Sequence, residues 1–207
     1  MRDLPGWQTL HDELAEHDFQ VIAVAIDEAV DKIRAAADGI TYPVLIDAEH
    51  VVTELYAISN VPTVILIDED DRIVQPNWNA FSNDTFREIT GIDSGAQREA
   101  IRRWVVDGTR IVDEDEAKTA VGDLSAEEEQ AKLHFRIANH LRRAGDDEGA
   151  ARNYARATEL APFDWTNRRA ALPLQGGDPF GEGYAELAKE YSAAGRPFHG
   201  IAGTQVT

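Results

Sequence analysis

The chain has 207 residues, with 38 acidic and 20 basic side chains, a net charge of −18 and 43% hydrophobic residues. This hydrophobic content suffices for one or two folded domains, whereas so acidic a chain would repel the phosphate backbone of nucleic acids and anionic membrane surfaces. The chain contains no cysteine, which excludes a disulfide, a thiolate metal ligand or a thiol nucleophile among these residues.

The longest apolar run, residues 21–26, is too short to span a membrane. The first residues also lack the apolar region of a secretory signal. We therefore expect no membrane insertion and a cytoplasmic location for the chain as given. The acidic surface fits either a protein from a high-salt cytoplasm or an ordinary acidic protein kept in solution by its charge, and composition does not choose between them.

The first half of the chain alternates helical and strand patterns. Helical spacing of apolar residues over 4–18 precedes a nearly continuous apolar run at 19–26, which predicts a strand at the centre of a sheet. Asp27 can cap the next helix. The pattern then predicts a strand over 42–47, a helix over 48–57, a strand over 61–68 and its hairpin partner at 72–74. This order is typical of an α/β sandwich with a mixed sheet.

The end of the α/β part is marked by a change in composition. After an irregular stretch that includes Trp78, the capping-box spacing of Ser94 and Gln97 predicts a further helix. Residues 108–125 are acidic and have no apolar period, which predicts a solvated linker. We therefore divide the chain into an α/β domain over 1–107, an acidic linker over 108–125 and a helical domain over 126–207.

Two consecutive helices are predicted at the start of the helical domain. The first opens at a capping box formed by Ser125 and Glu128, and the second follows Gly145. Residues 131–164 resemble one 34-residue tetratricopeptide repeat (TPR) unit, in which small residues let two helices approach closely. This resemblance implies packing at Ile137, Ala138, Leu141, Ala150, Tyr154, Ala157 and Pro162. Because repeat units seldom bury their faces alone, we expect packing against the α/β domain or another chain.

Three landmarks in the first half resemble those of a known family. They are Val24-Ala25-Ile26-Asp27 at a strand end, Tyr42-Pro43-Val44-Leu45-Ile46-Asp47 before a helix ending at Tyr56-Ala57-Ile58, and Asn60-Val61-Pro62-Thr63 before an apolar strand. In this order they resemble the TlpA/ResA branch of the thioredoxin-like fold, within the redoxin superfamily. The resemblance covers residues 1–107 and implies a thioredoxin-like α/β sandwich with thiol-disulfide exchange or antioxidant activity. It also implies a cis peptide before Pro62, in a loop where a substrate peptide pairs as an extra strand.

The chain departs from this family at the redox motif itself. The family pattern is Cys-x-x-Cys-x-x-Glu-x-Pro, of which the chain has only the tail, with Asp3 at the acidic position and Pro5 after it. The second cysteine would fall immediately before Met1, so the motif and the strand leading into it are absent. Exchange needs a thiolate and a resolving thiol, and we therefore expect the chain to be inactive as given. Either the start is misplaced or truncated, or this lineage has lost the motif.

Two functions remain open at this point. One is a redox-family protein without its thiols, in which Asp3 is a vestige of the family site or simply an acid favoured at a helix start. The other is a non-enzymatic module that presents a binding surface to a protein or peptide partner. The six histidines show no metal-ligand spacing, and the chain has no phosphate-binding glycine motif. We therefore predict surface histidines, no metal and no cofactor, and leave the oligomeric state open.

Overall fold

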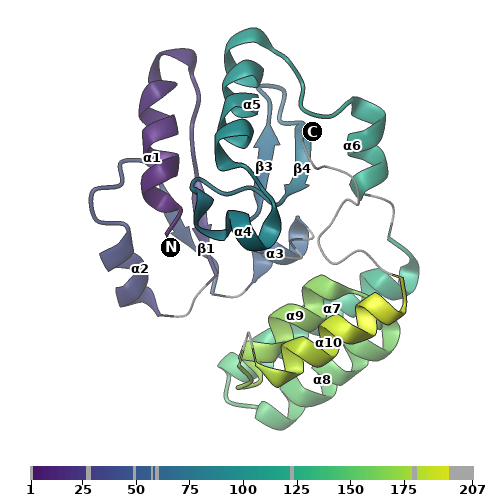
Figure 1. Cartoon of the computed structure of the whole chain (residues 1–207). Coiled ribbons are helices and arrows are strands. Elements are labelled where there is room, and N and C mark those ends of the chain that lie inside the picture. Colours follow the sequence, from purple (N-terminus) through teal and green to yellow (C-terminus); the bar gives the residue numbers. More distant parts are fainter. Residues whose placement is uncertain are drawn as a thin grey trace. The chain divides into compact units, whose positions relative to one another are not determined.

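Figure 1 shows the computed structural model, which describes residues 2–26, 29–48, 50–56, 58, 61–121, 124–178 and 181–195. These residues form two compact units, one within 1–48 and 61–120 and the other within 49–60 and 121–202. Within the described ranges, no helix has both the length and the apolar composition needed to cross a bilayer.

The first unit alternates helices and strands, as the α/β prediction requires. Its elements are α1 (Leu4–Glu13), β1 (Ala23–Ala25), α2 (Val30–Ala36), β2 (Val44–Ile46), β3 (Val64–Ile67), β4 (Ile73–Trp78), α4 (Arg87–Thr90), α5 (Ser94–Asp107) and α6 (Glu114–Val121), with single 3₁₀ turns at Ala15–His17 and Asp84–Phe86. Pro5 lies in the first turn of α1, where its missing N–H is not needed. Asp27 lies outside the described residues.

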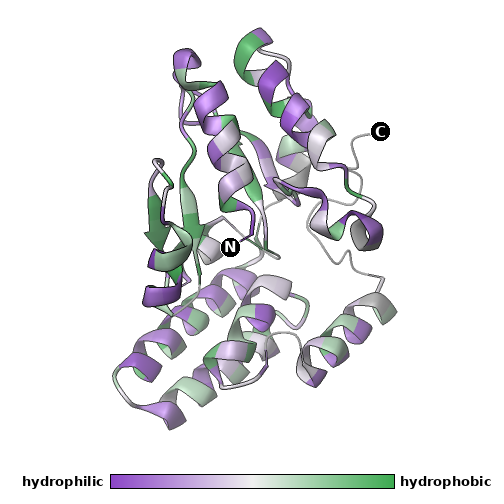
Figure 2. Ribbon diagram, turned by 60° about the vertical axis from the view of Figure 1, so that its left-hand side comes forward, coloured by the Kyte–Doolittle hydropathy of each residue, from purple (hydrophilic) through white to green (hydrophobic). Residues whose placement is uncertain are grey.

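The strands form two separate pairs. β1 and β2 are parallel, with Ala23 opposite Val44, and β3 and β4 are antiparallel, with Val64 opposite Trp78. The prediction of a central strand over 19–26 is therefore wrong for this structure, because β1 is three residues long and is bonded to β2 alone among the described strands. Figure 2 shows that the short paired strands at its left are hydrophobic in sequence, and Val24, Leu45 and Ile46 in these strands are exposed.

β4 is longer than the hairpin strand predicted over 72–74 and reaches residue 78. Trp78, expected in an irregular stretch, ends this strand and is only 1% exposed. It packs in one buried cluster with Leu10 of α1, Leu66 of β3 and Ile101 of α5. The residues next to Trp78 in the sequence are polar and do not predict a strand. Its position in β4 is stabilised by contacts with residues from other elements.

The start of α5 was predicted with the wrong capping residue. Asp93, not Ser94, is the N-cap, and its side chain accepts a hydrogen bond from the Ala96 N–H. Gln97 is buried and binds backbone groups far along the chain instead of closing a capping box. The side-chain amide of Gln97 is already hydrogen-bonded to Asn79 and Phe81, so it does not bond the backbone at the helix start.

The predicted solvated linker over 108–125 contains helix α6. Three acids, Glu114, Asp115 and Glu116, occupy its first turn, where the helix dipole favours negative charge. The Asp113 carboxylate accepts the Glu116 N–H at 2.8 Å, and Ala117 is buried. The acidic run is therefore a helix start rather than an irregular linker.

The second unit is helical. It comprises α3 (Val51–Leu55), α7 (Ala126–Arg143), α8 (Asp147–Leu160), α9 (Trp165–Leu174) and α10 (Glu182–Ala193). The predicted hairpin of α7 and α8 is confirmed, and so is its capping box, since Ser125 and Glu128 bond each other's backbone N–H. Gly145 lies between the helices with φ of +82°, a conformation that glycine adopts without strain.

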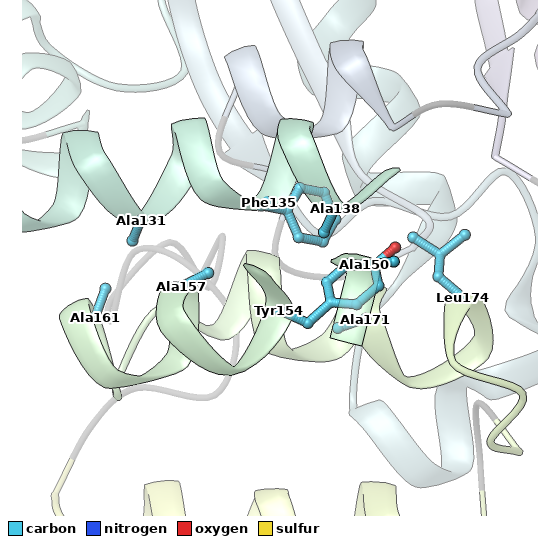
Figure 3. Close-up of a cluster of buried hydrophobic side chains, with 9 residues drawn as sticks. All are labelled: Ala131, Phe135, Ala138, Ala150, Tyr154, Ala157, Ala161, Ala171 and Leu174. Carbon is cyan, nitrogen blue, oxygen red and sulfur yellow. The ribbon is translucent and has the colours of Figure 1, made fainter. Parts of the chain in front are cut away.

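The contact between α7 and α8 is made mainly by small residues around two aromatic rings. Figure 3 shows this cluster, formed by Ala131, Phe135, Ala138, Ala150, Tyr154, Ala157, Ala161, Ala171 and Leu174. Four of the packing positions expected from the repeat pattern are in it, namely Ala138, Ala150, Tyr154 and Ala157, and Leu141 packs against it half-buried. Pro162 follows α8, and its carbonyl accepts a hydrogen bond from Arg168.

Ile137 was predicted to be a packing position and is not one. It is 46% exposed, together with Leu133 at 55%, one turn earlier on α7. The buried face of this helix carries Ala131, Phe135 and Ala138. Residues 133 and 137 lie about 200° around the helix from residue 135, so they point away from that face.

Candidate functional site

Asp3, the acid at the family position, binds a distant loop rather than the helix it precedes. It is the N-cap residue of α1, but its side chain makes no capping hydrogen bond. Its Oδ1 accepts the Ser82 N–H at 2.8 Å and the Asn83 amide at 3.1 Å. The single proton of the Ser82 hydroxyl is shared between the Asp3 carbonyl at 2.7 Å and Oδ1 at 3.1 Å. Asp3 therefore lies at the helix start, as the dipole interpretation expects, but its side chain bonds the segment at Ser82 and Asn83 instead of the first turn of α1.

A glycine permits this close approach. A Cβ placed on Gly6 would lie 2.6 Å from the Cβ of Ser82 and 2.7 Å from its carbonyl oxygen. Both separations are too short for carbon contacts, so position 6 requires glycine for Ser82 to reach Asp3. The one local sign of this close approach is a glycine directly after Pro5 in the first turn of a predicted helix, a place where glycine is not otherwise favoured.

The loop that holds Asp3 is itself held by α5. Gln97 donates its amide N–H to the Asn79 carbonyl and accepts the Phe81 N–H, both at 2.9 Å. Asp84 accepts the Ser94 N–H at 3.0 Å, and this bond contributes most to a pKa of Asp84 below its ordinary value. The start of α1 is thus positioned through Ser82 by α5, a long-range link that neighbouring residues in the sequence do not reveal.

Tyr42 completes the polar surroundings of the α1 start. Its hydroxyl donates to the Leu4 carbonyl at 3.1 Å, and its ring meets His11 edge-on with 5.8 Å between centroids. Burial, and secondarily the negative charge of Asp3, raise the pKa of Tyr42 to about 12. The phenol therefore stays neutral and remains a hydrogen-bond donor at any physiological pH.

Tyr42 predicts how stability changes at alkaline pH. Its pKa rises from the ordinary 10.0 to about 12 on folding, so its contribution is complete below pH 10 and is lost as the pH rises from 10 to 12. At roughly 1.4 kcal/mol per pKa unit, that loss is on the order of 2–3 kcal/mol. Urea titrations at several pH values between 9 and 12 should show wild type losing this much more than Tyr42→Phe, in which the other titrating groups are unchanged. If the free energies of unfolding of wild type and Tyr42→Phe fell in parallel with rising pH, the raised pKa would not belong to Tyr42.

The proline loop has the predicted peptide geometry. The Val61-Pro62 bond is cis, which confirms that expectation. Val61 is exposed, while Pro62 and Thr63 are half-buried ahead of β3. Asn60 lies outside the described residues. The hydrogen bonds described for Asp3 lead to Ser82 and Asn83, not to this loop.

The histidines are less uniformly exposed than predicted. His50, directly before α3, is only 4% exposed, and its carbonyl accepts a hydrogen bond from the hydroxyl of the buried Thr53. His134 is half-buried, with its Nδ1 2.8 Å from the Asn153 side-chain oxygen. Within the described ranges, no cluster of three or more His, Asp or Glu side chains is arranged to hold a metal ion.

Comparison with known proteins found similarity in the first half of the chain. Residues 2–75 match the AhpC/TSA family. A 90-residue stretch is 29% identical to the thiol-disulfide oxidoreductase ResA of Halalkalibacterium halodurans, covering 42% of this chain and 51% of that protein. The chain thus spans about half the length of this curated relative, and no solved structure matches it significantly.

The family match and the alternation of helices and strands in the first unit are consistent with a thioredoxin-like α/β fold of the redoxin type. The N-terminal part of the chain is similar to the AhpC/TSA family and to ResA. The helices from α7 onward lie beyond the residues matched by the family.

Proposed function

We propose that this chain is a thioredoxin-like protein of the thiol-disulfide oxidoreductase type that supplies the scaffold of the redox site but not its thiols. As given, it performs no dithiol exchange, because exchange needs a nucleophilic thiolate and a resolving thiol and none of its 207 residues is cysteine. The activity named for ResA is the reason to place the domain in this reaction class.

The observation that carries this proposal is the fixed position of the Asp3 carboxylate. The Ser82 N–H and hydroxyl and the Asn83 amide hold it directly before α1. In the family that this chain resembles, the residue at this position is an acid, three residues after the second cysteine of the Cys-x-x-Cys motif. A carboxylate fixed there can exchange a proton with a neighbouring thiol during reaction. If Asp3 only tied α1 to the loop, removing its charge would not affect thiol chemistry.

The test compares the chain with an extended version of itself. In an insulin-reduction assay, the purified chain should show the rate of a no-protein blank. A version extended before Met1 by an apolar strand ending in Cys-x-x-Cys should reduce insulin above that blank, and a Ser-x-x-Ser version should not. Asp3→Asn in the active version should lower the rate about tenfold or more and alter its pH profile. Activity in the cysteine-free chain, or inactivity of a folded extended version, would contradict the proposal.

A second candidate is a non-enzymatic interaction module, and the surface of α7 favours it. We propose that the helical part is a TPR-like module, because Ala138, Ala150 and Ala157 form its buried helix contact. Leu133 and Ile137 form an exposed apolar pair one turn apart on α7, and we propose that the partner contacts this pair. Binding of a protein or peptide partner there should be lost when Leu133→Ser and Ile137→Ser are combined. The melting temperature of the double variant should equal that of the wild-type chain.

A further inference from the structure

Helix α7 is buried on one face and exposed on the other. Figure 3 shows that Ala131, Phe135 and Ala138 are directed toward α8, and all three are buried. At about 100° per residue, the opposite face carries a row of residues spaced four and three apart, a spacing typical of helices that pack lengthwise on one another. Every member of this row, which we call the α7 seam, is exposed: Ala126, Gln130, Leu133, Ile137, His140 and Ala144, the last at the C-cap.

The side chains of the α7 seam follow the same order from either end. From residue 126 to residue 144 the order is small, polar, apolar, apolar, polar, small. A second copy of the helix, laid antiparallel with the two-fold axis level with residue 135, therefore places side chains of the same kind against each other. The pairs are Leu133 with Ile137, Gln130 with His140, and Ala126 with Ala144. In such an isologous contact residue i meets residue j and j meets i, so the α7 seam is complementary to itself.

The charges beside the α7 seam are complementary in the same antiparallel arrangement. Glu129 lies near the start of the seam, and His140 and Arg143 lie near its end, all three exposed. With a rise of about 1.5 Å per residue, Glu129 of one copy lies within about 3 Å, measured along the helix axis, of His140 and Arg143 of the other copy. A parallel pair would instead place Glu129 against Glu129. The charges therefore favour the antiparallel pair.

We propose that the partner of the α7 seam is a second copy of this chain, bound as an antiparallel helix pair through Leu133 and Ile137 of both copies. This inference rests on the proposed interaction function and names its partner.

The dimer is weak and reversible. Each copy contributes two large apolar side chains on a helix of 18 residues, about 27 Å long, which is little for a permanent dimer. Arg136 lies beside the two-fold axis, close to its own counterpart, and each chain carries a net charge of −18. Both features oppose the pairing, so the dimer forms at high protein concentration and is favoured by salt, which screens the repulsion between the chains.

Sedimentation velocity of the full chain tests the pairing. In about 1 M salt, where the Debye length is about 3 Å, wild type should shift from monomer to dimer as its concentration rises to about 1 mM. Leu133→Ser combined with Ile137→Ser should stay monomeric over the same range. Val106→Ser is the control, because it removes an exposed apolar side chain from α5, and it should dimerise like wild type. Wild type that stays monomeric, or equal loss of the dimer in the control, would overturn the proposal.

Cross-linking tests the register. Because the chain contains no cysteine, a single-cysteine variant reports one position only. Gln130→Cys mixed with His140→Cys should give about tenfold or more disulfide-linked dimer than either variant alone. The antiparallel pair places 130 against 140, whereas two copies of the same position are about 15 Å apart, beyond the reach of a disulfide.

Two results of the cross-linking would overturn the proposal. Preferential linkage of Gln130→Cys to itself would mean a parallel pair, and equal linkage in all three samples would mean random collision. The proposed interaction function would survive either result, as it would survive a monomeric wild type, because its own test with the double serine variant applies to any other protein or peptide partner.

Discussion

Phe135→Ala should destabilise the helical unit by about 3–5 kcal/mol, the usual cost of truncating a fully buried aromatic residue. Phe135 is 2% exposed between α7 and α8, and its ring meets that of Tyr154 edge-on at 5.8 Å. The small residues around it, such as Ala138 and Ala150, cannot extend into the space it leaves. Urea titration followed by circular dichroism measures the loss, and hydrogen exchange in α7 and α8 should increase with it.

Leu133→Ala is the matched control for this prediction. It removes a large apolar side chain from the same helix, two residues away, but from an exposed position. Its effect should be within about 0.5 kcal/mol. Similar losses from both substitutions would show that α7 does not bury the face carrying Phe135, and the hairpin would have to be reinterpreted.

Trp78→Ala should destabilise the first unit by a comparable amount, about 3–5 kcal/mol. Trp78 is the largest fully buried side chain of the chain's described part, at 1% exposure, and it touches the cluster that joins α1, β3, β4 and α5. Its removal leaves a cavity at the point where these elements meet. Hydrogen exchange should report the change as faster exchange in β3, β4 and α5.

Phe86→Ala is the corresponding control in the same unit. Phe86 is an exposed aromatic residue in a 3₁₀ turn after β4, and its ring contacts that of Phe81 with 5.8 Å between centroids, so its truncation should cost only about 0.5–1.5 kcal/mol. If Trp78→Ala were as mild as this control, the buried cluster would not be the main source of stability in the first unit.

Ser125 and Gln97 show where local sequence reasoning succeeds and where it fails. The box formed by Ser125 and Glu128 was predicted from spacing alone and is present, because both partners lie within one helical turn. Ser94 and Gln97 have the same spacing, yet Gln97 bonds the backbone of residues 79 and 81. A cap competes with every other partner that the fold brings near, and only the tertiary structure reveals those competitors.

The sequence by itself determined the α/β class of the first part, its redoxin resemblance, the helical hairpin and the absence of thiols, because periodicity, local capping and composition are properties of neighbouring residues. The tertiary structure alone decided that Asp3 binds Ser82 and Asn83, about eighty positions away, and that Ile137 faces outward. It also decided that β1 pairs with β2 alone among the strands that the structure describes. A strand's place in a sheet depends on which neighbours are present to hydrogen-bond it, and the composition of 21–26 specifies burial without supplying them.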